Sequence, residues 1–121
     1  MNAINVPLQK DQVEAWRRWA AECTGPRRKD FADFNRRMGL TEHRAWLDLG
    51  PGGPQIIVLH GGPGADTFMK RLATSGHPFD TWFRENITRF HGHDFRQPLD
   101  VALPERVIDW SEQGKTRKAE A

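Results

Sequence analysis

Residues 43–60 read HRAWLDL-GPGGP-QIIVLH, and this stretch decides the fold class. Two runs rich in β-forming residues, His43–Leu49 and Gln55–His60, are separated by Gly50–Pro54. Glycine supplies the positive φ angles that a tight reversal requires, and proline restricts the backbone beside it. The stretch therefore predicts an antiparallel β-hairpin in the middle of the chain.

Two helices are predicted before the hairpin. From Asp11 on, apolar residues recur every three or four positions, as on one helix face: Val13, Trp16, Ala20 and Cys23. Gly25-Pro26 breaks this helix, and a second apolar stripe follows, made of Phe31, Phe34 and Met38 and stopped by Gly39. Cys23 is the single cysteine and lies in the first stripe, which predicts a buried, unreactive thiol.

Two more helices are predicted after the hairpin. Asp66 can cap a short one that carries Phe68, Met69 and Leu72 and ends before Gly76. Pro78 suits the first turn of a longer one that runs to Gly92. One face of this longer helix is apolar and largely aromatic, with Phe79, Trp82, Phe83, Ile87 and Phe90. We therefore expect it to be heavily buried.

The remaining segments complete the predicted topology. Asn2–Leu8 reads as a first strand and Glu105–Trp110 as a last one, with a long connection over 93–104. Together the elements predict one α+β domain over residues 1–110, with the ferredoxin-like βαββαβ order and broken helices, followed by a polar tail over 111–121. Helices on one face leave the other face bare, so we expect a homodimer that covers it.

Composition and charge argue against some partners. The chain has 18 Lys and Arg against 16 Asp and Glu, a net charge of +2. This mixed surface is not the basic stripe that binds nucleic acid. The longest aliphatic run, Ile56–Leu59, is far shorter than the roughly 20 residues of a membrane span, and no signal-peptide pattern opens the sequence. We expect a cytoplasmic protein that binds neither nucleic acid nor membrane.

Several short motifs resemble one known group of proteins. Gly25-Pro26-Arg27-Arg28, Ala45-Trp46-Leu47, residues 78–85 (PFDTWFRE) and His91-Gly92 are similar to small uncharacterised members of the dimeric α/β-barrel superfamily. That superfamily also holds cofactor-free monooxygenases of antibiotic biosynthesis and haem-degrading enzymes. Over Asp11–Trp110 the resemblance implies a dimeric α/β barrel without a required cofactor. The sequence departs from the pattern at Pro7 and at Leu59–Gly64.

The motif HGGPG at His60–Gly64 invites comparison with the oxyanion loop of α/β-hydrolases. Those enzymes also need a serine in the motif G-x-S-x-G, and neither Ser75 nor Ser111 lies in one. We therefore interpret the motif as a strand-to-helix turn.

Aromatic residues and one histidine suggest a pocket. The chain has five Trp and seven Phe but no Tyr, and Trp46 and Trp82 are our candidates for the wall of an apolar pocket. His91 ends the aromatic helix, where a neutral imidazole could accept or donate a proton, so it is the candidate catalytic residue. Alternatively, His91 only bonds the last carbonyls of its helix.

Charged residues supply further candidates for binding. Arg27, Arg28 and Lys29 place positive charge at a helix start, which opposes the helix dipole. Either a carboxylate such as Asp80 pairs with them, or they bind an anionic substrate with Arg28 as an anchor. His60 and Asp80 are further candidates for contact with a ligand. The histidine spacing is not diagnostic of a metal site, and we expect none.

These residues support one leading hypothesis and two alternatives. The leading hypothesis is a pocket for a small aromatic or polycyclic molecule, in a cofactor-free biosynthetic enzyme that uses acid/base or oxygen chemistry. One alternative is a non-catalytic ligand-binding or interaction protein. The other is a haem-binding dimeric barrel.

Overall fold

The computed structural model describes residues 1–98 and 104–112 and has the α+β class that the sequence predicts. Three strands, β1 (Asn2–Pro7), β2 (Glu42–Asp48) and β3 (Gln55–Gly61), form one antiparallel sheet in the order β1-β3-β2. The central hairpin is confirmed, with Asp48 opposite Gln55 and His43 opposite His60. Pro7 is tolerated because it ends an edge strand, where a missing N–H costs little.

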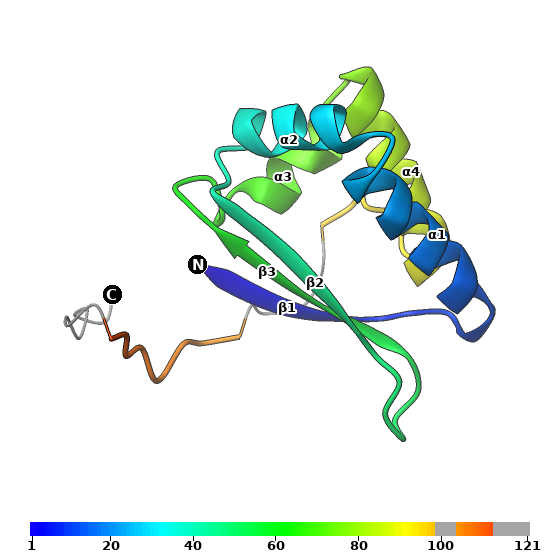
Figure 1. The fold of residues 1–121 in the computed structure, drawn as a ribbon, viewed down its shortest axis with the longest axis horizontal. Coiled ribbons are helices and arrows are strands. Elements are labelled where there is room, and N and C mark those ends of the chain that lie inside the picture. The colour runs from blue at the N-terminus through cyan, green and yellow to red at the C-terminus, as the bar shows by residue number, and fades with distance from the viewer. Residues whose placement is uncertain (99–103, 113–121) are drawn as a thin grey trace.

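Four α-helices cover one face of this sheet (Figure 1). They are α1 (Val13–Thr24), α2 (Arg28–Arg37), α3 (Phe68–Thr74) and α4 (Pro78–His91), and a single 3₁₀ turn, η1 (Lys10–Gln12), precedes α1. Both broken-helix predictions are therefore confirmed. None of the helices within residues 1–98 and 104–112 has the length and apolarity that crossing a bilayer requires.

The ends of α4 follow the sequence signals, whereas the start of α3 does not. Pro78 occupies the first turn of α4, and Gly92 ends that helix in the left-handed region at a φ of 67°. The prediction that Asp66 caps α3 is wrong, because the helix starts one residue later and its N-cap is Thr67. The Asp66 carboxylate instead accepts a hydrogen bond of 2.8 Å from the Asn2 amide, which joins the turn before α3 to β1.

The core lies between the helices and one face of the sheet. Side chains alternate between the two faces of each strand, and the helix-facing set comprises Ile4, Val6, His43, Ala45, Leu47, Ile56, Val58 and His60. Phe34, Phe90 and Leu72 are fully buried above it. Cys23 is 3% exposed, and burial raises the pKa of its thiol to about 12, as expected of an unreactive cysteine.

The prediction of a last strand at Glu105–Trp110 is wrong. These residues form no helix or strand and pair with none of the three strands, and Figure 1 shows them as an extended segment. Val107 is 80% exposed and Ile108 is 84% exposed. As neighbours in sequence they would point to opposite faces of a strand, so only one of them could face the helices. Residues 113–121 of the predicted tail and residues 99–103 of the predicted connection lie outside the described residues.

The HGGPG segment is the predicted strand-to-helix turn. It links the end of β3 to α3 and packs against the connection between α2 and β2. The Gly64 N–H donates to the Gly39 carbonyl over 2.8 Å, and a Cβ atom on Gly64 would overlap the carbonyl oxygen of Met38. The glycines therefore allow two backbone segments to touch.

Candidate functional site

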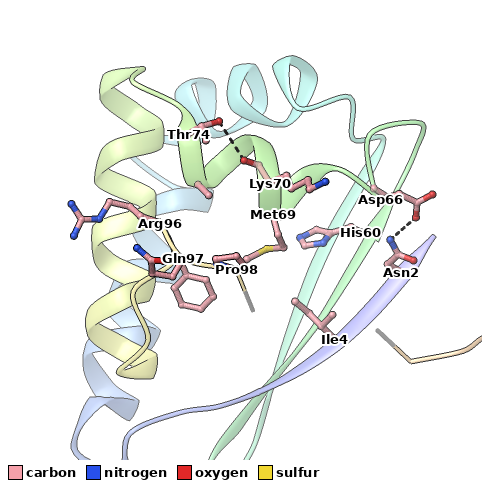
Figure 2. Close-up of a pocket in the computed structure, with 13 residues that line it drawn as sticks. Asn2, Ile4, His60, Asp66, Met69, Lys70, Thr74, Arg96, Gln97 and Pro98 are labelled. Carbon is pink, nitrogen blue, oxygen red and sulfur yellow. Dashed lines mark hydrogen bonds between the residues drawn. The ribbon is translucent and has the colours of Figure 1, made fainter. Parts of the chain in front are cut away.

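A cavity of about 410 Å³, the outer cavity, opens between the sheet, α3 and the segment after α4. Its apolar wall consists of Ile4 from β1, Met69 and Ala73 from α3, and Phe95 and Pro98 from the segment after α4. His60 of β3 also lines it, and Figure 2 shows its ring beside Met69 and Ile4. This volume falls within the range of small-molecule sites.

A second cavity of about 70 Å³, the inner cavity, lies between the sheet and the helices. Four residues line both cavities and make them neighbours: Ile4, His60, Met69 and Phe95. The remaining wall of the inner cavity is aliphatic and aromatic except for two more histidines, His43 and His91. Among the residues that the structure describes, no Asp, Glu, Lys or Arg side chain lines this cavity.

His43 and His60 form a pair at the boundary of the core. They lie opposite each other on β2 and β3, and their ring centroids are 4.6 Å apart in an edge-to-face arrangement. The Nδ1 of His43 lies 2.8 Å from the Asn35 side-chain oxygen, which accepts, so this nitrogen carries the proton. The ring of His60 packs on Phe68 with a centroid distance of 4.3 Å.

Burial keeps both imidazoles neutral. It lowers the pKa of His60 to about 4, and burial together with the neighbouring His60 lowers the pKa of His43 to about 3. A neutral imidazole offers one N–H donor and one acceptor nitrogen. The site can therefore exchange hydrogen bonds with a guest at neutral pH without placing a charge in the core.

We expect the free energy of unfolding to fall as the pH drops from about 6.5 to about 4. In this window the unfolded chain binds protons at both histidines, whereas the folded chain does not, because its pKa values lie lower. The stabilisation that the neutral histidines provide is therefore fully present above the pKa of a histidine in the unfolded chain, about 6.5. It is lost as the pH falls below that value. Each histidine contributes on the order of 1 kcal/mol per pH unit.

Urea unfolding at pH 7, 6 and 5 measures this slope. His60→Leu should make the slope shallower by about 1 kcal/mol per pH unit, because it removes one proton-binding difference and leaves those of His43 and His91. A free energy of unfolding that stays constant between pH 7 and pH 5 would contradict the buried, neutral pair.

Two histidines of the sequence hypothesis line the inner cavity, His60 and His91. The Nδ1 of His91 donates to the Pro7 carbonyl over 2.7 Å, so the ring is fixed to β1 and not to the last carbonyls of its own helix. Burial lowers the pKa of His91, although the Pro7 carbonyl partly opposes this. His91 is thus a tethered imidazole beside the inner cavity.

The two predicted tryptophans do not share a wall. Trp46 is 50% exposed on the face of the sheet that carries no helices. Trp82 belongs to α4, packs on Phe79 at 5.3 Å between centroids, and lies 4.1 Å from the Arg27 guanidinium above its ring. Neither residue lines the outer or the inner cavity.

The predicted charged residues also lie apart from the cavities. Arg28 is exposed, and its guanidinium donates to the Gly25 carbonyl over 3.2 Å. The expectation that Asp80 pairs with Arg27, Arg28 or Lys29 is wrong, because Arg37 from the last turn of α2 occupies its carboxylate with two hydrogen bonds of 2.8 and 2.9 Å. Arg27 instead pairs with Glu22 at 2.9 Å.

Three residues that the sequence hypothesis did not select belong to the site: His43, Met69 and Phe95. A signal for His43 was present, since a hairpin folded about Gly50–Pro54 places it opposite His60. Met69 and Phe95 come from segments on either side of α4, and no local pattern brings them together. Their meeting depends on how the helices pack.

No group of three or more His, Cys, Asp and Glu side chains within 1–98 and 104–112 could hold a metal ion. Comparison of the chain with protein-family models, with curated proteins and with solved structures finds no match. The proposals below therefore rest on the chain's own geometry.

Proposed function

We propose that this protein binds a small apolar molecule in the outer cavity, with His60 in contact with it. The observation that carries the proposal is a cavity of about 410 Å³ that is already formed in a single chain. Most of its wall is aliphatic, aromatic or thioether, so a guest would remove apolar surface from water on both sides.

An aromatic or polycyclic guest suits these walls best. The Phe95 ring favours an offset or edge-to-face aromatic neighbour, and the flexible thioether of Met69 adapts to a flat surface and contacts it favourably. Charged side chains also line this cavity, namely Asp66, Lys70 and Arg96, and all three are exposed. They can remain in water while the guest occupies the apolar part.

Equilibrium dialysis with naphthalene, an aromatic probe without polar atoms, tests the proposal. Met69→Trp places a larger side chain in the wall of both cavities and should weaken naphthalene binding at least tenfold, because the space is filled. The matched control is Leu49→Trp in the hairpin loop, 57% exposed and outside both cavities, which should bind as the unaltered chain does. Absence of naphthalene binding by the unaltered chain, or equal binding by all three proteins, would refute the proposal.

We further propose that a second copy of the chain covers the open face of the sheet. Ile57, Leu59 and Trp46 share this face, opposite the helices, and an apolar sheet surface favours burial. The strand order β1-β3-β2 is that of the first three strands of a ferredoxin-like sheet. Pairing two such sheets face to face would build the dimeric barrel that the sequence motifs imply.

A further inference from the structure

We propose that the guest carries a neutral hydroxyl group that enters the inner cavity and bonds to the Nε2 of His60 and the Nε1 of Trp19. This inference rests on the proposed function, because it specifies the head group of the molecule that the outer cavity binds. It identifies the guest class as neutral molecules with an apolar body and one hydroxyl group.

Two buried polar atoms within the described part of the chain have no hydrogen-bond partner: the Nε1 of Trp19 and the Nε2 of His60. Leaving such a group unpaired is costly, so native proteins rarely do so. Both residues line the inner cavity. A hydrogen-bonding occupant of that cavity is therefore the candidate partner for these two atoms.

A hydroxyl group fits the chemistry of these two atoms. The indole Nε1 of Trp19 can only donate, so its partner must accept. The Nε2 of His60 donates in one neutral tautomer and accepts in the other. A hydroxyl group has one donor and two acceptor sites, so its chemistry matches Trp19 and either tautomer of His60.

The head group must also be neutral. No ionised side chain within residues 1–98 and 104–112 lines the inner cavity, so a carboxylate, phosphate or ammonium group there would lack a counter-charge from them. The depressed pKa values of His43 and His60 reflect the same property, since this environment disfavours charge. A charged group would stay among the exposed side chains of the outer cavity.

The two cavities are arranged for such a guest. His60, Met69, Ile4 and Phe95 line both of them, so a guest beside these residues can lie in the outer cavity and reach the inner one. Figure 2 shows the His60 ring together with Met69 and Ile4, at the sheet side of the outer cavity. The apolar body would pack on the aliphatic and aromatic wall, and the hydroxyl group would point toward Trp19.

Three probes with the same ring system test this inference: naphthalene, 2-naphthol and 2-naphthoate, each measured by equilibrium dialysis at pH 7. We expect 2-naphthol to bind at least tenfold more tightly than naphthalene, and 2-naphthoate no more tightly than naphthalene. Trp19→Phe keeps an aromatic ring but removes the N–H, and His60→Leu removes the imidazole. Each variant should reduce the ratio of 2-naphthol affinity to naphthalene affinity measured in that same variant.

The outcomes separate this inference from the proposed function. Equal affinities for naphthalene and 2-naphthol would overturn the hydroxyl head group but leave the apolar site intact. Tightest binding of 2-naphthoate would overturn the neutral head group. Failure of all three probes to bind would refute the proposed function itself. The unaltered chain alone decides among these outcomes if a variant does not fold.

Discussion

Gly64→Ala is expected to destabilise the chain by about 3 kcal/mol or more. The added methyl group would overlap the carbonyl oxygen of Met38, which is backbone and cannot rotate away as a side chain can. A hydrogen bond of 2.8 Å from the Gly64 N–H to the Gly39 carbonyl holds the two segments together. Relieving the overlap would break this bond and separate α3 from the connection between α2 and β2.

Gly76→Ala is the matched control for this change. A methyl group at Gly76 would meet no atom within 4 Å, and its φ is not positive, so we expect a change within about 1 kcal/mol. Urea unfolding followed by circular dichroism gives both free energies. Equal stabilities of the two variants would contradict the close backbone contact at the HGGPG turn.

Arg37→Ala is expected to cost about 3–5 kcal/mol, because it leaves the buried carboxylate of Asp80 without its counter-charge. Asp80 is 0% exposed. Two hydrogen bonds join Arg37 at the end of α2 to Asp80 at the start of α4. Burial alone would raise the pKa of Asp80, but hydrogen bonds from Arg37 and Ser75 outweigh it and hold the pKa below its ordinary value. This stabilisation is therefore present above pH 4 and is lost as the pH falls further.

Two comparisons identify the cause of this loss. Arg17→Ala breaks an exposed ion pair with Glu14 at 2.6 Å and should cost no more than about 1 kcal/mol. The double variant Arg37→Ala/Asp80→Ala should be more stable than Arg37→Ala alone, since no unpaired charge remains. If Arg37→Ala costs as little as Arg17→Ala, the buried pair does not hold α2 against α4.

The helices and the hairpin could be predicted because their signals are local. The three- and four-residue spacing of apolar side chains in α1 and α4 reflects one helix face packed on a core, whatever the neighbouring element is. Gly50–Pro54 likewise determines a chain reversal from its own backbone preferences. The failed strand at Glu105–Trp110 shows the limit of such signals, because a strand also needs a neighbour to pair with.

The site could be predicted only in part, because it depends on contacts between distant segments. Asp80 meets Arg37 across 43 positions of sequence, and nothing local favours it over Arg27 or Arg28. Trp46 lies between two apolar neighbours, Ala45 and Leu47, so polarity alone does not say which of the three faces the helices. The pairing register decides it, by placing Ala45 and Leu47 on the helix side.

The central claim is that the cavity beside His60 is a binding site for an apolar guest. Nuclear magnetic resonance of the ¹⁵N-labelled chain during titration with naphthalene tests it most directly, because every backbone amide reports its own surroundings. We predict saturable shifts at Ile4, Ala65 and Met69, which line the outer cavity, and little change at Trp46 and Ile57 on the open face. Shifts confined to the open face, or no saturable shift at any residue, would contradict the claim.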